Sequence, residues 1–168
     1  MILEEITALE DKWMPEKYSM PHVFSHERPN RRQLEVYEAW SMIFELYVIE
    51  ARDGNTEALK RALFLYWYSY SEPYELTGLY MLDKELSLDV LGKVNGIVKK
   101  NILDIEFKWM ISYYYSIADF YIDQFKGFDE LKKISRITDS LLWREYICKS
   151  CFTSRGQMGH YWESILES

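Results

Sequence analysis

The chain has 168 residues and a net charge of −7, and its residues are 48% hydrophobic, 17% aromatic and 28% charged. This length and composition predict a single domain over residues 1–168 and exclude the disordered, collagen-like and low-complexity classes. The acidic balance disfavours nucleic acid as a partner, because phosphates bind to basic surfaces. It suits ordinary solubility or a basic protein partner.

The N-terminus carries Glu4 and Glu5 where a secretory signal has basic residues. No apolar run approaches the roughly 20 residues that a membrane span needs. Cys148 and Cys151 are the only cysteines, and two are too few for a disulfide scaffold, which agrees with a reducing compartment. We therefore expect a cytoplasmic protein that does not contact a membrane.

In the first half of the chain, apolar residues recur at three- and four-residue steps, which predicts helices. The first two cover residues 2–13 and 31–52, and the third begins at an Asn55 or Thr56 cap and stops before a proline. The segment 13–30 has no such period and predicts a long irregular loop, a kind of segment that is often functional. This loop contains Pro15, Pro21, Pro29, His22 and His26.

In the second half, residues 72–78 predict a turn or a short helix, and residues 88–98 carry an apolar helical stripe. Residues 102–125 are apolar on most sides and predict a central helix, with a strand over 109–115 as the competing interpretation. The remaining expected elements are two helices, at residues 129–152 and 157–167. The predicted fold is all-α, an irregular single-domain helical bundle of about five to seven helices.

Aromatic residues gather in two stretches, 64–70 and 107–115. Large rings that carry a hydroxyl or N–H group can build a core, a groove or a recognition surface, and these polar groups need partners when they are buried. Most of the rings fall on helical stripes that face a core. Four tyrosines fall on no stripe, so either the loop and tail cover them or they face a partner: Tyr68, Tyr74, Tyr80 and Tyr115.

Cys148-Lys-Ser-Cys151 has the spacing of a redox or zinc pair. A redox pair belongs at a helix N-terminus, whereas these cysteines are expected late in a helix, so we interpret them as core residues. A zinc site that adds His22 and His26, or His160, is the alternative. We assign no metal ligand and no cofactor.

Asp119 and Asp123 are the best candidates for acid–base chemistry, because burial can raise the pKa of one carboxyl group while its neighbour stays ionised. Acids one helical turn apart are more often part of a solvated face. The sequence contains no phosphate loop, dinucleotide fingerprint, nucleophile elbow or zinc-protease motif. We assign no catalytic residue, and we favour binding over catalysis.

Two functional hypotheses follow. The first is a protein-binding module, such as an acidic inhibitor or immunity-type protein that neutralises a basic toxin or enzyme, by analogy of size and charge. Its tail residues Arg155, Tyr161 and Trp162 either cap the core or line a groove for the partner. The second is an enzyme or small-ligand-binding protein with an aromatic pocket between helices. The residues of that pocket are Tyr66, Tyr70, Trp109 and Tyr113, polarised by Arg61, Glu72 or Asp119.

Overall fold

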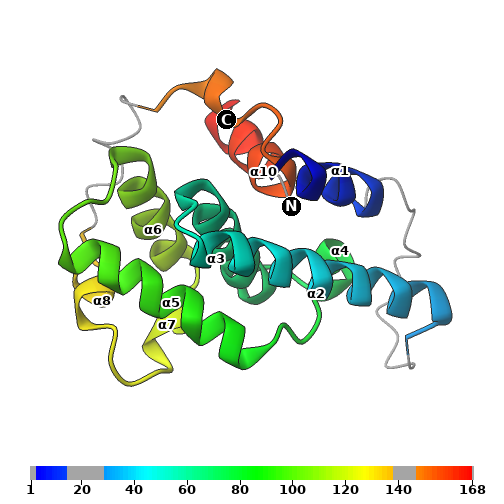
Figure 1. Cartoon of the computed structure of the whole chain (residues 1–168), viewed down its shortest axis with the longest axis horizontal. Helices are drawn as coiled ribbons and strands as arrows, with labels where there is room; N and C mark the ends of the chain where they lie inside the picture. Colours follow the sequence, from blue (N-terminus) through cyan, green and yellow to red (C-terminus); the bar gives the residue numbers. More distant parts are fainter. Residues whose placement is uncertain (1–2, 15–28, 138–146, 168) are drawn as a thin grey trace.

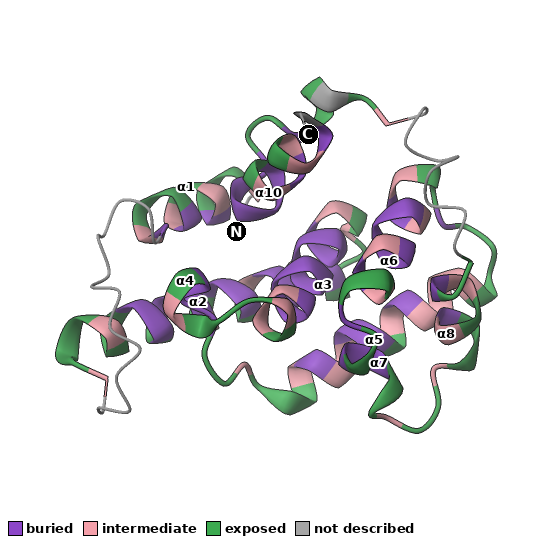
Figure 2. Cartoon of the chain, turned by 180° about the vertical axis from the view of Figure 1, so that it is seen from behind, coloured by how far each residue is buried: buried purple, intermediate pink, exposed green. Residues whose placement is uncertain are grey.

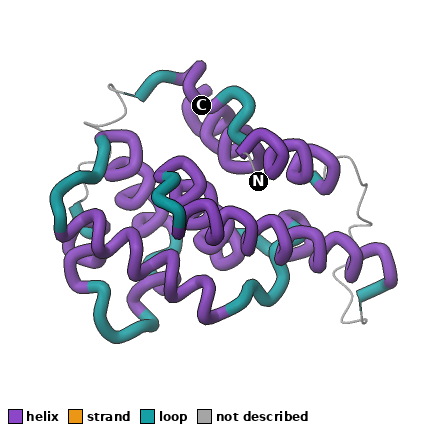
Figure 3. Tube along the Cα trace, in the orientation of Figure 1, coloured by secondary structure: helices purple, strands orange, loops and turns teal. Residues whose placement is uncertain are grey.

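The computed structural model describes residues 3–14, 29–137 and 147–167, and these residues form helices and loops with no strand (Figures 1 and 3). The all-α class is confirmed. The longer helices are α1 (Leu3–Trp13), α2 (Arg31–Arg52), α3 (Thr56–Ser71), α5 (Lys84–Lys99), α6 (Ile105–Ile117) and α10 (Gly156–Glu167). The shorter elements are α4 (Tyr74–Thr77), α7 (Phe120–Asp123), α8 (Asp129–Ser135) and the 3₁₀ helix η2 (Lys149–Phe152).

Side-chain caps fix where the longer helices begin. Asn30 accepts a hydrogen bond from the backbone N–H of Gln33, whose side chain accepts one from the backbone of Asn30, so α2 starts with a complete capping box. Asn55, one of the two predicted caps, accepts from the third residue of α3. Asp83 and Asp104 cap α5 and α6 in the same way.

Nine α-helices lie in the described ranges, more than the five to seven predicted, and part of the reason is that one predicted helix is divided. The helix expected over 102–125 ends at Ile117, because Ala118 leaves helical geometry with φ −148° and ψ 73°, and α7 follows. The prediction of one helix over 129–152 is also wrong, because α8 ends at Ser135. Neither break contains a glycine or proline, so the sequence pattern gives no sign of it.

Helix α10 covers Gly156–Glu167, where the sequence predicts a C-terminal helix at residues 157–167. Most of the expected 13–30 loop, with His22 and His26, lies outside the described residues, and so do residues 138–146. Within the ranges that the structure describes, no helix is long and apolar enough to cross a membrane.

Helix α3 lies at the centre of the fold. It packs against α2, α4, α5, α6, α7 and α10, and every residue from Ala58 to Trp67 is buried. Figure 2 shows these buried residues along α3 and exposed residues on the outer helices. Helices α1 and α10 lie side by side on one side of α2 and α3, and α5 and α8 lie on the other (Figures 1 and 2). The segment expected to be central, residues 102–125, flanks α3 instead.

Candidate functional site

The structure does not bring the four rings of the predicted aromatic pocket together. Tyr66 and Tyr70 contact each other edge to face, with 5.2 Å between ring centroids. The hydroxyl of Tyr66 donates to the backbone carbonyl of Tyr121 at 2.8 Å. Trp109 and Tyr113 lie in a different cluster, in contact with α10.

In that second cluster, the ring of Trp162 lies 4.3 Å from Trp109 and 4.8 Å from Tyr113. Trp162 is completely buried, and the hydroxyl of Tyr161 lies 3.0 Å from that of Tyr113. These rings fill the space between α3, α6 and α10. The two aromatic residues of the tail therefore cap the core in this structure.

Arg155, the third tail residue of the predicted set, belongs to an ion-pair network that joins α10 to α3 and α6. Its guanidinium group bonds to the carboxylate of Glu57 and lies 2.8 Å from that of Glu106. Lys60 also reaches Glu106, at 2.8 Å. Burial alone would raise the pKa of Glu106, but hydrogen bonds from Arg155 and Lys60 outweigh burial and hold that pKa below its usual range.

The network continues through Arg61 to Glu10, which is only 1% exposed. Arg61 pairs with Glu57 at 2.9 Å and donates to the hydroxyl of Tyr47 at 3.1 Å. That hydroxyl donates to the Glu10 carboxyl group at 2.9 Å. Burial raises the pKa of Glu10 to about 8, against the opposing effects of Tyr47 and Arg61. The sequence pattern places Glu10 on the polar side of a helix and gives no sign of its burial.

The other predicted acids do not form a buried pair. Glu72, Asp119 and Asp123 are all exposed. Asp123 accepts from the hydroxyl of Tyr115 at 2.7 Å and pairs with Arg136 at 3.3 Å. These surroundings are those of solvated surface acids.

Cys148 and Cys151 are exposed free thiols beside and within the 3₁₀ helix, so their predicted place in the core is wrong. The predicted long helix that would have buried them ends before residue 138. Among the residues that the structure describes, no group of three or more His, Cys, Asp or Glu side chains is arranged to hold a metal ion. His160 is exposed on α10.

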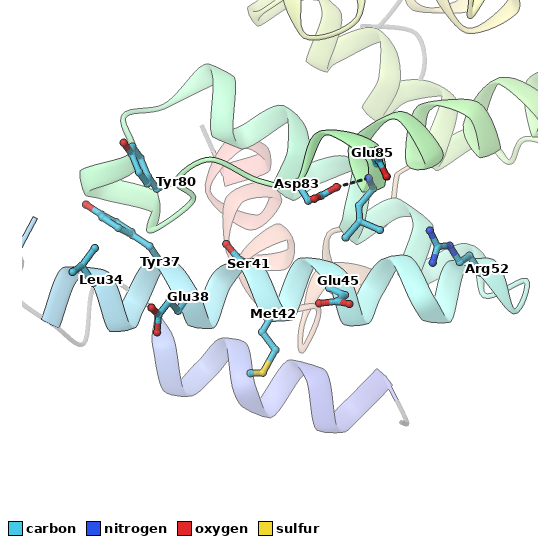
Figure 4. Close-up of a pocket in the computed structure, with 11 residues that line it drawn as sticks. Leu34, Tyr37, Glu38, Ser41, Met42, Glu45, Arg52, Tyr80, Asp83 and Glu85 are labelled. Carbon is cyan, nitrogen blue, oxygen red and sulfur yellow. Dashed lines mark hydrogen bonds between the residues drawn. The ribbon is translucent and has the colours of Figure 1, made fainter. Parts of the chain in front are cut away.

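A shallow groove of about 750 Å³ lies between α2 and the segment that leads from α4 into α5 (Figure 4). Among the lining residues that the structure describes, four are acids and one, Arg52, is basic and pairs with Asp89 at 2.7 Å. Leu34 and Met42 add apolar surface, 46% and 44% exposed. The acids of the groove are Glu38, Glu45, Asp83 and Glu85.

Three tyrosines form a cluster at one end of this groove, which we call the tyrosine cluster: Tyr37, Tyr74 and Tyr80. Tyr37 lies 5.8 Å from Tyr74 and 5.2 Å from Tyr80, and the latter two lie 4.8 Å apart, between ring centroids. Figure 4 shows Tyr37 and Tyr80 at the end of the groove opposite Arg52. Tyr74 and Tyr80 are two of the rings that lie on no predicted helical stripe, and both are more than a third exposed.

The hydroxyl of Tyr37 is buried and has no hydrogen-bond partner among the residues that the structure describes. The residue is 4% exposed. Burial, with smaller contributions from Tyr74 and Glu75, raises the pKa of Tyr37 to about 12, so the hydroxyl is protonated at neutral pH. Unpartnered buried hydroxyls are rare because they lose their hydrogen bonds to water.

Gly78 sets the position of the chain that forms the wall of the groove. Its φ of +76° is left-handed, and a Cβ at this position would lie 2.5 Å from the Trp40 side chain. Only glycine fits here, so the chain can turn across Trp40 after α4 and run along α2. In the segment that follows, Tyr80 and Asp83 line the groove, whereas Leu79 and Met81 line a second hollow on the other side.

This second hollow, of about 390 Å³, contains half of the predicted aromatic pocket. Tyr66 and Tyr70 line it together with Lys84 and Gln124. Trp109 and Tyr113 do not, since they pack against α10. Comparisons with protein-family models, with curated proteins and with solved structures found no match to this chain.

Proposed function

We propose that this protein is a protein-binding module whose acidic groove receives a basic segment of another protein. The observation that carries the proposal is the combination of four acids with tyrosine rings and exposed apolar side chains along one groove. Tyrosine is enriched at the centres of protein interfaces because it offers a large apolar surface and a polar group.

Charge supports a basic partner in particular. Arg52, the one basic side chain among the described residues of the groove, already pairs with Asp89, so it does not neutralise the four acids there. Complementary charge steers a partner to such a surface and raises the rate of association. The same negative potential repels nucleic acid, which agrees with the net charge of −7.

The form of this function predicted from the sequence is an inhibitor or immunity-type protein that neutralises a basic toxin or enzyme in the cytoplasm. The groove supports such a role because a protein of this kind acts by binding its target. Binding in the groove needs no catalytic group. The aromatic rings of the tail fill the core, so we assign them a structural role and not a role in binding.

An affinity capture from the native host tests the proposal. The full chain is compared with a double variant, Glu38→Lys with Glu45→Lys, and with a control of equal charge, Asp119→Lys with Glu130→Lys. All four acids are exposed, and only the first two line the groove. We expect a basic protein at near-stoichiometric yield with the wild type and the control, and its loss with the groove variant. Equal capture by all three proteins, or no specific capture by any, would contradict the proposal.

A small-ligand-binding protein is the second candidate, and the 390 Å³ hollow favours it. This volume lies within the range of about 300–1,000 Å³ that is typical of ligand pockets. Lys84 and Gln124 provide polar groups beside Tyr70. Native mass spectrometry of protein purified from its host tests this function: a bound small molecule that is lost in a Lys84→Glu variant supports it, and ligand-free protein contradicts it.

A further inference from the structure

We propose that the tyrosine cluster is a recognition site for one arginine side chain of the partner. The inference rests on the proposed function, since it names the chemical group that docks at one end of the acidic groove. It is carried by three features of the cluster: an unpartnered hydroxyl, two exposed ring faces and nearby carboxyl groups.

The unpartnered hydroxyl belongs to Tyr37. The side chain lines the groove and is 4% exposed, and its hydroxyl finds no partner among the described residues. A hydroxyl left in this state is stabilised by any ligand that brings a hydrogen-bonding group to it. The oxygen of the hydroxyl has free lone pairs, so it can accept a hydrogen bond from a cationic N–H group.

The ring faces belong to Tyr74 and Tyr80, which are 38% and 37% exposed. A cation over the face of a tyrosine is attracted by the negative charge of the π-system. A guanidinium group on the exposed part of Tyr80 lies next to the residue that carries the unpartnered hydroxyl, because the rings of Tyr80 and Tyr37 are in contact, with 5.2 Å between their centroids. The cluster therefore offers exposed aromatic surface beside a buried acceptor.

Carboxyl groups complete the site. The negative charge of Glu75 lies close enough to raise the pKa of both Tyr74 and Tyr37. Glu38, the residue after Tyr37, is exposed and lines the groove. An anionic ligand would be repelled by these groups, whereas a cation is attracted by both.

The same features favour arginine over lysine. The guanidinium group is planar, stacks on aromatic rings and carries several N–H donors, so it can contact a ring, a hydroxyl and a carboxylate at once. The lysine ammonium group is compact and strongly hydrated, and it gains less from a ring face.

Two peptides of equal charge, hexa-arginine and hexa-lysine, test the inference by titration against the full-length protein. Wild-type protein is expected to bind hexa-arginine at least about fivefold more tightly than hexa-lysine. Tyr37→Phe removes only the hydroxyl, and Tyr80→Leu removes a ring face. Both variants should reduce the preference for hexa-arginine over hexa-lysine to less than about twofold.

Two further variants separate the site from the groove as a whole. Tyr70→Leu is the matched control, because Tyr70 is as exposed as Tyr80 and lines the other hollow, so the arginine preference should persist. The double variant Glu38→Lys with Glu45→Lys should weaken both peptides about tenfold or more. Circular dichroism establishes that each variant is folded.

The outcomes distinguish this inference from the function on which it rests. Arginine preference that disappears in both tyrosine variants supports the site. If wild-type protein binds the two peptides equally, or if both tyrosine variants keep the preference, the arginine site is overturned while charge-dependent docking stands. If neither peptide responds to the double charge change in the groove, the proposed function is overturned together with the site.

Discussion

The carboxyl group of Glu10 occupies the space that a side chain at position 156 would need. A Cβ added to Gly156 would lie 1.4 Å from Oε2 of Glu10, and the backbone of Gln157 lies close enough to oppose the rise in the pKa of the same carboxyl group. Glu10 lies in α1, and Gly156 begins α10. The first and last helices of the described structure are thus joined through one buried side chain that also accepts a hydrogen bond from Tyr47 in α2.

Gly156→Ala is therefore expected to be strongly destabilising. The glycine has a φ of +61°, so alanine meets backbone strain as well as the buried carboxyl group. Strain of about 1–2 kcal/mol and overpacking of about 1–3 kcal/mol predict a loss of about 2–5 kcal/mol in the free energy of unfolding, measured by urea denaturation.

Gly54→Ala is the matched control for the backbone strain, because Gly54 has a φ of +94° and open space around its Cα. It should lose only about 1–2 kcal/mol. A double variant, Glu10→Ala with Gly156→Ala, should lose less than the sum of its single variants, because the first change removes the group that the second meets. Equal losses at positions 54 and 156 would show that the carboxyl group is not the obstacle.

The stability of the protein should depend on pH through Glu10. Its pKa is about 8 in the fold, against an ordinary value of 4.5. Between these values the folded state holds a proton that the unfolded chain has lost, so the free energy of unfolding falls as pH rises from about 4.5 to 8. The slope approaches about 1.4 kcal/mol per pH unit.

Glu10→Gln isolates this effect, because glutamine keeps the shape and still accepts the hydrogen bond from Tyr47. The stability of wild type relative to this variant should be highest near pH 4.5 and should decline up to pH 8. Glu4→Gln, an exposed change in the same helix, should leave the pH profile unchanged. Parallel profiles for wild type and Glu10→Gln would refute a titration of Glu10 in this range.

Periodicity and capping predict the main helices, but they do not predict which polar residues meet in three dimensions. Asn55 was predicted as a cap because its side chain acts on the next turn of its own helix. Glu10 could not be recognised as buried, because its partners come from three other helices. The division of the helix at Ala118 also has no local signal.

The candidate groove was accessible to sequence reasoning only in part. Tyr74 and Tyr80 were identified as rings that no helical stripe explains, and both belong to the tyrosine cluster. Tyr37 lies on the apolar stripe of α2, so the sequence predicts that it is in the core. The sequence does not show that its hydroxyl has no partner among the described residues. The acids of the groove come from α2 and from the start of α5 with its cap Asp83, and the turn at Gly78 lies between these two elements in the chain.

Removing Arg155 should destabilise the protein strongly at neutral pH. The side chain is 10% exposed and contacts Glu57 and Glu106, so Arg155→Ala leaves two partly buried carboxylates without this partner. Breaking a buried ion pair costs about 3–5 kcal/mol, and chemical denaturation at pH 7 measures the loss. Arg136→Ala is the control, because Arg136 forms an exposed pair and its loss should change stability little.

The loss caused by Arg155→Ala should diminish at acid pH. Burial alone would raise the pKa of Glu106, but hydrogen bonds from Arg155 and Lys60 lower it below the usual range. The stabilisation is therefore complete above the ordinary pKa of the unfolded chain and is lost as pH falls through the lower value of the fold. A difference between wild type and variant that stays constant down to pH 3 would contradict this account.

The hydroxyl of Tyr37 should reduce stability in the absence of a partner. Tyr37→Phe keeps the ring and its contacts with Tyr74 and Tyr80 but removes a buried group that has no hydrogen bond within the described structure. We expect a gain of about 1 kcal/mol in the free energy of unfolding, measured by thermal and urea denaturation. Tyr47→Phe is the opposite control, because that hydroxyl bonds to Glu10 and Arg61 and its loss should cost about 1–3 kcal/mol. Destabilisation by both changes would mean that the Tyr37 hydroxyl is already satisfied, which would remove the argument that it awaits a ligand.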